Sequence, residues 1–515
     1  MTPLLANYLG GRARAGTGSG TPLFDPVTGT ELARVDATGL DLASGFAHAR
    51  QEAGPTLRAM TYARRGELLD KIVQVLQANR DEYDDISTAN SGTVKSDTAL
   101  DVEGAIYTVR TYAKLARGLG ERRHLLDADA VPLGKAGDFH SQHVRVPTRG
   151  VALFINAFNF PAWGLWEKAA PALVSGVPVF VKPATATAWL TQRMVQHVIE
   201  AGILPPGALN VVCGSSQGLL EQLQPFDVVS FTGSAETAAI VRSHPAVVRA
   251  SVRVNIEADS LNSALLLPGE AAGSPAFELL ANEVAREMTQ KSGQKCTAIR
   301  RIFVPLPLYD ATAAAIAARL QGVRVGNPRH PEVRMGSLVS RAQLASVRQG
   351  LAALKQHTDV LHDGAGHALV DADPALACCL GPTLLGSRDT QAAALVHDME
   401  VFGPVATLLP YRDGAHALDL VRRGQGSLVA SLYGSDAAAL GGAALALADT
   451  HGRVHVVSPE VAASHTGHGN VMPQSVHGGP GRAGGGEELG GVRALNFYHR
   501  RTAVQAAGAV VAGLR

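Results

Sequence analysis

One cysteine in this chain stands where it could act as a nucleophile. Cys296 follows Gly293, is flanked by Lys291 and Lys295, and precedes an apolar run, 302–304, that is typical of a strand. Glycine permits the close approach of a reacting carbon, and we expect the two lysines to favour the thiolate by Coulomb attraction. Most free cysteines are small buried hydrophobes, so this local pattern alone leaves both interpretations open.

Other polar side chains stand next to apolar runs that are typical of strands. Asn159 follows the run 152–155, Glu257 ends the alternating run 252–257, and Glu400 lies beyond the cysteine. An amide, a carboxylate and a thiol can together stabilise an anionic oxygen, accept a proton and attack a carbon. If the fold brings these residues together, they predict covalent catalysis.

The order of four motifs resembles the aldehyde dehydrogenase superfamily. The motifs are Asn159-Phe-Pro161, the strand that ends in Glu257, Gly293-Gln-Lys-Cys296 and Glu400-Val-Phe-Gly-Pro404. The resemblance extends from about residue 20 to the last residue. It implies an enzyme that oxidises an aldehyde with a nicotinamide cofactor.

The resemblance implies a catalytic role for several of these residues. Cys296 would attack the aldehyde carbon, while Asn159 and the Cys296 amide stabilise the oxyanion. Hydride would leave for the nicotinamide, and water activated by Glu257 would release the acid from the resulting thioester. Beside an apolar pocket, we expect Glu257 to have a raised pKa. Lys168 matches a lysine behind the site that relays protons, whereas its neighbour Glu167 has no role that the sequence supports.

A second set of residues matches the cofactor site of the family. Gly233 and Ser234 end a strand before a helical run, and the amides at such a helix start can receive a phosphate oxygen. The glycine-rich Rossmann fingerprint is absent from this region. Lys182 matches the lysine that binds the adenosine ribose. The other matches are Glu400 for the nicotinamide ribose, and Phe402 and Phe158 for the surroundings of the nicotinamide.

The residue at position 185 predicts the type of cofactor. Thr185 stands where NAD-preferring relatives carry a glutamate, whose charge would repel a 2′-phosphate. A neutral hydroxyl next to Lys182 could accept that phosphate. We therefore expect NADP, with NAD possible but weaker. We expect no metal, because His140 and His143 have no further ligand at coordinating spacing.

Composition limits the class of protein. The 515 residues carry 46 lysines and arginines against 45 aspartates and glutamates, so no bulk charge favours nucleic acid or an anionic membrane. No apolar stretch is long enough to cross a bilayer, and the amino terminus has no secretory leader. Four cysteines in such a long chain do not form a disulfide framework. We expect a cytoplasmic protein.

The pattern of apolar runs predicts an α/β fold. Alternating strands and helices between residues 150 and 257 indicate a parallel, Rossmann-like sheet, preceded by helices over 41–119. With the resemblance, we expect an NAD(P)-binding domain at 1–122 and 148–257, and a second α/β catalytic domain at 258–457. Residues 123–147 and 490–515 would form a β-strand oligomerisation arm of a homodimer. Residues 458–489 would be connecting loops, because 478–491 is rich in glycine. The histidines at 465 and 468 would lie on their surface.

The carboxyl-terminal part departs from the commonest members of the family. The segments 467–491 and 501–505 resemble a branch that oxidises semialdehydes carried on a coenzyme A thioester during the breakdown of aromatic compounds such as benzoate. A general aldehyde dehydrogenase and a CoA-acylating enzyme remain alternatives, and Glu257 argues against the second because thiol release needs no water-activating carboxylate. A catalytically silent binding protein is a third alternative.

Overall fold

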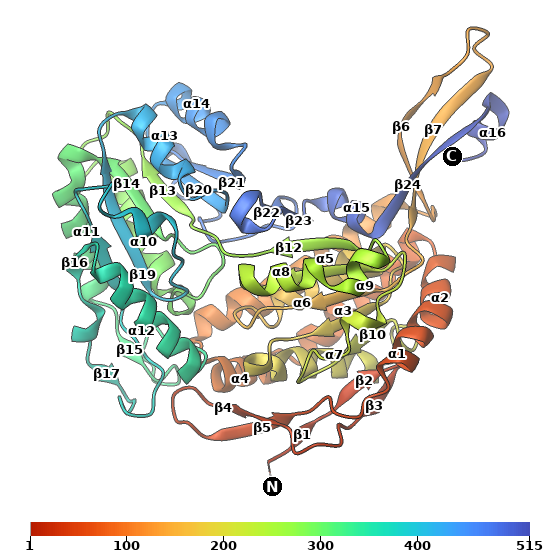
Figure 1. Cartoon of the computed structure of the whole chain (residues 1–515), viewed down its shortest axis with the longest axis horizontal. Helices are drawn as coiled ribbons and strands as arrows, with labels where there is room; N and C mark the ends of the chain where they lie inside the picture. The colour runs from red at the N-terminus through yellow and green to blue at the C-terminus, as the bar shows by residue number, and fades with distance from the viewer. Residues whose placement is uncertain (1) are drawn as a thin grey trace.

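The computed structural model describes residues 2–515, which form two seven-stranded sheets and a three-stranded sheet that projects from the body (Figure 1). The first large sheet and its helices occupy the centre and right of the view, and the second lies on the left. Both large sheets are mainly parallel, which the sequence predicted for the first sheet only. None of the helices within residues 2–515 is both long and apolar enough to span a bilayer.

The first large sheet has the strand order β12-β11-β8-β9-β10-β2-β3. The chain adds β9 and β10 on one side of β8, and β11 and β12 on the other, so the order reverses between β8 and β11. Ligands of such sheets bind at the carboxyl ends of the strands near this reversal. All five parallel strands match predicted runs: β8 (Ala152–Ile155), β9 (Val179–Lys182), β10 (Leu209–Val211), β11 (Val228–Thr232) and β12 (Arg253–Glu257).

Strands near the amino terminus extend this sheet and form a small one beside it. The structure has β2 (Asn7–Leu9) and β3 (Arg12–Arg14) in the large sheet, and β1 (Leu4–Leu5), β4 (Thr21–Phe24) and β5 (Glu31–Val35) in the small one. Asn7 joins the two sheets, because its buried amide donates to Asp36 O at 2.8 Å and accepts from the Cys213 amide at 2.7 Å.

Helices cover the first sheet over the predicted region and beyond it. A Cβ at residue 66 would lie 2.9 Å from Ala113 O, so Gly66 allows α3 and α5 to pack closely. The sequence missed α6, which is buried along almost its whole length. Leu220–Gln222 forms only a 3-10 turn. The helices are α1 (Leu42–His48), α2 (Gly54–Ala59), α3 (Tyr62–Ala78), α4 (Arg80–Ser91), α5 (Lys95–Leu119), α6 (Trp163–Val174), α7 (Ala188–Glu200), α8 (Ala235–Ser243) and α9 (Pro245–Arg249).

The second large sheet has the order β16-β18-β19-β14-β13-β20-β21, and only the β16–β18 pair is antiparallel. Its strands are β13 (Ser263–Leu266), β14 (Arg301–Pro305), β16 (Asp359–His362), β18 (Thr383–Gly386), β19 (Val405–Tyr411), β20 (Ser427–Tyr433) and β21 (His451–Val457). Two short strands, β15 (Val325–Gly326) and β17 (Leu369–Val370), pair beside it. The helices of this half are α10 (Pro275–Thr289), α11 (Tyr309–Gln321), α12 (Arg341–Lys355), α13 (Gly414–Arg422) and α14 (Ala437–Leu447).

The projecting sheet consists of β6 (Leu125–Pro132), β7 (Phe139–Pro147) and β24 (His499–Ala507). Strands β7 and β24 pair antiparallel over their full length, so two segments far apart in sequence form one arm (Figure 1). Helix α15 (Leu495–Tyr498) precedes β24, and α16 (Gly508–Ala512) follows it.

The prediction that residues 478–491 are only loop is wrong. Strands β22 (Val476–Gly479) and β23 (Gly486–Leu489) form an antiparallel hairpin within 458–489. Side chains would prevent its close packing, since a Cβ at Gly478 would lie 2.0 Å from Gly486 O, and one at Gly486 would lie 2.4 Å from Ile256 O. The glycines therefore let the hairpin lie directly against β12.

We expect Arg301 to be essential for the stability of the second sheet. Its fully buried guanidinium donates to the carbonyls of Leu261 at 2.8 Å and Val421 at 2.9 Å, near the carboxyl end of α13. Arg301→Met would leave these carbonyls unpaired and lower the free energy of unfolding by about 3 kcal/mol. Urea unfolding checks this against Arg324→Met, which removes an exposed ion pair to Glu332. Equal midpoints for the two variants would contradict the expectation.

Candidate active site

A cavity of about 590 Å³ lies at the carboxyl ends of β8, β9, β11 and β12, where the strand order reverses. It extends to the segment that holds Glu400 in the other half of the molecule. Of the residues that the sequence singled out, the structure brings ten to this cavity: Phe158, Asn159, Lys182, Thr185, Gly233, Ser234, Glu257, Cys296, Glu400 and Phe402. Lys168 lies behind it, in a small adjoining cavity that Asn159, Glu257 and Cys296 also line.

The loop that carries Cys296 has an unusual backbone. Lys291, Ser292 and Gly293 have φ values of 51°, 54° and 68°, so the chain turns sharply in the left-handed region. A Cβ at residue 293 would lie 2.3 Å from Gly403 O, which makes glycine necessary at this contact. Asn262 holds the loop by donating to Cys296 O at 2.8 Å.

Arg300 fixes the cysteine loop to the segment of Glu400. Its guanidinium donates to Gly403 O at 2.7 Å and to Gly293 O at 2.9 Å, and its Nε lies 3.5 Å from Glu400 Oε1. One cation therefore connects the thiol loop, the Glu400 carboxylate and the turn after Phe402. No sequence motif had indicated a role for Arg300.

The prediction that Lys291 and Lys295 favour the thiolate is wrong, because both ammonium groups are bound elsewhere. Lys295 Nζ donates to Glu287 Oε1 and to Gln290 Oε1, each at 2.7 Å. Lys291 Nζ lies 4.3 Å from the centre of the Phe160 ring and 3.9 Å from Asp101 Oδ2. Their positions in the sequence placed them near the cysteine, but the sharp turn directs their side chains into the helical layer.

Glu257, at the end of β12, is a buried carboxylate among partners of both signs. His477 Nε2, from the hairpin, lies 3.2 Å from Glu257 Oε2. Burial raises the pKa of Glu257, but His477, Lys168 and a hydrogen bond from Cys296 together lower it to below its ordinary value. The prediction that Glu257 has a raised pKa is therefore wrong, and its carboxylate is ionised at neutral pH.

Lys168, on α6, lies in a buried network behind Glu257. Its ammonium contacts Glu167 and lies 3.1 Å from Glu488 Oε2. Burial alone would lower the pKa of Lys168, but the carboxylates of Glu167, Glu488 and Glu257 raise it well above its ordinary value. Burial also raises the pKa of Glu167 strongly. Glu488 is itself held by Ser230 at 2.6 Å and Asn255 at 2.9 Å.

The Cys296 thiol lies between two cavities. The first is the cavity at the strand ends, and the second, of about 300 Å³, is lined by α5 residues, Phe160, Trp163 and the segment 469–472. Burial raises the pKa of Cys296 well above its ordinary value, and Glu257 adds to this through its charge and a hydrogen bond. The resting thiol is therefore protonated, and it can be reached by one molecule from each side.

The first cavity has polar groups suited to a dinucleotide. Lys182 and Thr185 line one part of it, and burial lowers the pKa of Lys182. At another part, burial raises the pKa of Glu400 to about 7, and Glu400 Oε1 accepts no hydrogen bond in the described residues. Its partner there is Arg300 Nε, at the long distance of 3.5 Å, so this buried acceptor is suited to a ribose hydroxyl. The Phe402 ring packs edge-on against Phe158, with centroids 5.7 Å apart.

The expected phosphate site at the start of α8 is only partly open. The Gly233 amide donates to Glu257 O at 3.1 Å, and the Ala235 amide donates to Asp259 Oδ1 at 3.1 Å. Ser234 caps the helix by accepting from the Thr237 amide at 3.3 Å. Two amides of this turn therefore have partners within the chain, which corrects the expectation that they are free for a phosphate.

The sequence missed residues whose partners are distant in the chain. His477 and Glu488 lie in the glycine-rich segment that was expected to be loop, and nothing in its composition indicated a contact with Glu257 or Lys168. His468 was expected on the surface, but it is fully buried and lies 2.5 Å from Ser431 Oγ. The residues around Val476 and His477 show no alternation of apolar and polar side chains that would have indicated a strand.

We expect Glu257→Gln to make the Cys296 thiol more acidic, because it removes a charge and a hydrogen bond that raise the pKa of Cys296. Alkylation of Cys296 by iodoacetamide, followed by peptide mass analysis over a range of pH, should show a midpoint lower by about one unit. Glu236→Gln, on the exposed surface of α8, should leave the midpoint unchanged. A higher midpoint in Glu257→Gln would show that the carboxylate promotes ionisation of the thiol, and an unchanged midpoint would show that it has no effect; either result would contradict the expectation.

Comparisons with solved structures agree with this architecture. The crystal structure of PnpE in complex with nicotinamide adenine dinucleotide superposes with a TM-score of 0.84, at 24% sequence identity, and covers 98% of each chain. The crystal structure of HpcC from Thermus thermophilus gives 0.85 at 23% identity, and covers 100% of this chain and 93% of that one. At these identities the likeness concerns the fold.

Comparisons of sequence are more specific. The chain is 55% identical over 477 residues to 3,4-dehydroadipyl-CoA semialdehyde dehydrogenase of Aromatoleum evansii, over 92% of this chain and 93% of that protein. It is 26% identical to betaine aldehyde dehydrogenase of Vibrio vulnificus strain CMCP6, over 83% of this chain and 85% of that enzyme. The model of the aldehyde dehydrogenase family matches residues 14–504. The chain therefore belongs to the aldehyde dehydrogenase family and is an oxidoreductase that acts on aldehydes.

Proposed function

We propose that this enzyme oxidises a semialdehyde carried on a coenzyme A thioester, of the 3,4-dehydroadipyl-CoA semialdehyde type, to the carboxylic acid with NADP, in the breakdown of aromatic compounds such as benzoate. The observation that carries this proposal is the 55% identity, over almost the full length of both chains, to a protein named for that substrate. The thiol between two cavities supports it, because a cofactor and an aldehyde could approach from opposite sides.

In the proposed mechanism, Cys296 passes its proton to the Glu257 carboxylate and its sulfur bonds to the aldehyde carbon. The oxygen becomes an anion, and Asn159 and the Cys296 amide stabilise it. A bound nicotinamide would supply the hydride acceptor, and loss of hydride from the carbon held by Cys296 would leave a thioester on that sulfur. Glu257 must pass the proton from Cys296 on to solvent, so that it is ionised again when it takes a proton from the water that releases the acid.

The buried network behind Glu257 supports this role of general base. Cations near a carboxylate favour its ionised form, and Lys168 lies behind Glu257 with a pKa well above its ordinary value. The same network argues against the CoA-acylating alternative, in which a thiol releases the acyl group and no water has to be activated. A catalytically silent protein would have no need to keep Glu257, Cys296 and Lys168 in one buried cluster.

The NADP preference rests on the part of the cavity around Lys182 and Thr185. Thr185 presents a hydroxyl whose bond to Gly214 O, at 3.4 Å, is long, so it remains available to a phosphate. The carboxylates that line the cavity, Glu257, Asp259 and Glu400, belong to other segments. A 2′-phosphate next to Lys182 would therefore meet a cation and a neutral hydroxyl.

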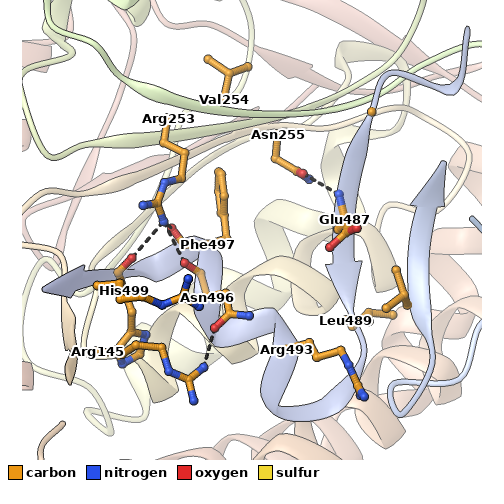
Figure 2. Close-up of a pocket in the computed structure, with 13 residues that line it drawn as sticks. Arg145, Arg253, Val254, Asn255, Glu487, Leu489, Arg493, Asn496, Phe497 and His499 are labelled. Atoms are coloured by element: carbon orange, nitrogen blue, oxygen red, sulfur yellow. Dashed lines mark hydrogen bonds between the residues drawn. The ribbon is translucent and has the colours of Figure 1, made fainter. Parts of the chain in front are cut away.

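The projecting arm supports a homodimer. Its strands β6 and β24 are sheet edges, and Val131, Leu133 and Phe139 are exposed apolar residues on it. At its base lies a cavity of about 420 Å³ lined by four arginines, of which Arg253 binds the backbone of Asn496, Phe497 and His499 (Figure 2). An exposed edge next to a basic cavity is suited to a second copy of the chain. A monomeric mass in light scattering would contradict this.

We expect Thr185→Glu to lower kcat/KM for NADP by about tenfold or more, because the new carboxylate would repel the 2′-phosphate. Thr185→Val, which removes the hydroxyl without adding charge, is the matched control and should have a smaller effect. Initial rates at equal subsaturating concentrations of NAD and NADP measure the preference. Faster rates with NAD in the unaltered enzyme would overturn the proposed cofactor.

We expect a CoA-linked semialdehyde to be converted to its free acid with the original thioester intact and without added coenzyme A. Mass analysis of the products checks this, and a new acyl-CoA that forms only with free coenzyme A would support the acylating alternative. A simple aliphatic aldehyde with an equal kcat/KM would show that the CoA portion contributes nothing. Cys296→Ala should abolish turnover and leave NADP binding nearly intact.

A further inference from the structure

The β22–β23 hairpin places His477, whose imidazole can bind a metal ion, next to Cys296 and Glu257. Cys296 Sγ, His477 Nε2 and a Glu257 carboxylate oxygen all lie within 4.8 Å of one another. The His477 to Glu257 distance is 3.2 Å, close to the separation of about 3.4 Å between two ligand atoms on a tetrahedral zinc ion. Cys296 lies in the loop before β14, His477 in β22 and Glu257 at the end of β12. The three side chains therefore meet through the tertiary fold, and no single stretch of sequence contains all of them.

A thiolate, an imidazole and a carboxylate are the ligand types that Zn²⁺ prefers, and three protein ligands with one open position are typical of zinc in an enzyme site. We propose that Cys296, His477 and Glu257 form a binding site for a soft divalent cation such as Zn²⁺, whose binding reversibly blocks the nucleophile. This inference goes beyond the aldehyde chemistry, since it concerns the resting enzyme without substrate.

The charges around the thiol favour a cation. The carboxylates of Glu257, Glu167 and Glu400 are all close enough to act on the thiol by their charge, and carboxylates attract a dication, whereas the ammonium of Lys168 behind Glu257 opposes it. Glu257 Oε1 accepts no hydrogen bond in the described part of the chain, so the carboxylate keeps an acceptor for a metal ion. Both cavities beside Cys296 give a route to the site.

The binding step exchanges a proton for the metal. The S–H bond of Cys296 breaks, an S–Zn bond forms, and the proton leaves to solvent, with no change in oxidation state. His477 contributes the lone pair of Nε2, and Glu257 contributes one carboxylate oxygen. A chelator reverses the step, because the sulfur regains a proton when the metal leaves. The bound thiolate cannot attack a carbonyl carbon or an alkylating reagent.

Protection of Cys296 from iodoacetamide, read by peptide mass analysis of the full-length protein, tests the site without substrate. We expect Zn²⁺ to slow alkylation of Cys296 by about tenfold or more, EDTA to restore it, and Mg²⁺ to have no effect, because Mg²⁺ prefers oxygen ligands. His477→Gln should weaken the protection by at least about tenfold, since it removes one of three ligands. Competition with a chromophoric chelator should give one fewer tight Zn²⁺ site in Cys296→Ala.

The matched control is His362→Gln. His362 Nε2 and His367 Nε2 lie 3.0 Å apart on another part of the protein and could bind Zn²⁺ by themselves. Protection of Cys296 should be unchanged in this variant, and NADP binding to His477→Gln verifies that the variant is folded. Equal protection in His477→Gln and the unaltered protein, loss of protection in His362→Gln, or no protection by Zn²⁺ at all would each overturn the proposal. None of these results would decide the proposed aldehyde oxidation, which the unaltered enzyme carries out in metal-free buffer and which is measured separately.

Discussion

The site depends on keeping one buried carboxylate charged. An isolated carboxylate in a protein interior costs several kcal/mol, so Glu257 stays ionised only because other charges are held close to it. The ammonium of Lys168 supplies such a charge, and the His477 ring lies 3.2 Å from Glu257 Oε2; the two residues come from α6 and β22, which are far apart in the sequence. The end of β12, the hairpin and α6 must therefore assemble together, and the chemical state of the base depends on the packing of all three.

The glycine-rich hairpin shows how that packing is achieved. His477 and Glu488 are directly opposite each other in the β22–β23 pair, so both side chains project from one face. One contacts Glu257 and the other contacts Lys168. Side chains at Gly484 or Gly486 would collide with Ile256 O, one residue before Glu257. The absence of side chains at these glycines allows the hairpin to pack closely against β12. This contact, and not a need for flexibility, explains the glycines.

The sequence predicted the residues that line the cavity better than it predicted their electrostatics. Asn159 and Glu257 each follow or end a parallel strand, and such strands bring their carboxyl ends to one edge of a sheet, so their convergence could be expected from order alone. The lowered pKa of Glu257 could not be predicted in this way, because its partner His477 lies far along the chain, in a segment whose composition is typical of loop.

The two lysines beside Cys296 were misjudged because three consecutive residues in the left-handed region turn their ammonium groups away from the thiol. Helix α6 was missed because both its faces are buried, so it lacks the polar stripe that marks a surface helix.

The resting enzyme holds its nucleophile in the unreactive form. Burial and the charge of Glu257 raise the pKa of the thiol, while His477 and Lys168 lower the pKa of the carboxylate, so transfer of the proton from Cys296 to Glu257 is uphill. Each unit of separation between two pKa values adds about 1.4 kcal/mol to that transfer. A positive charge brought into the first cavity by a ligand would reduce this cost most directly, because it would stabilise the thiolate and leave the carboxylate's own partners in place. An oxidised nicotinamide ring carries such a charge. Under the proposed function, the binding of cofactor would therefore both provide the hydride acceptor and make the thiol more acidic, and the thiol would remain protected from other electrophiles until the cofactor is present.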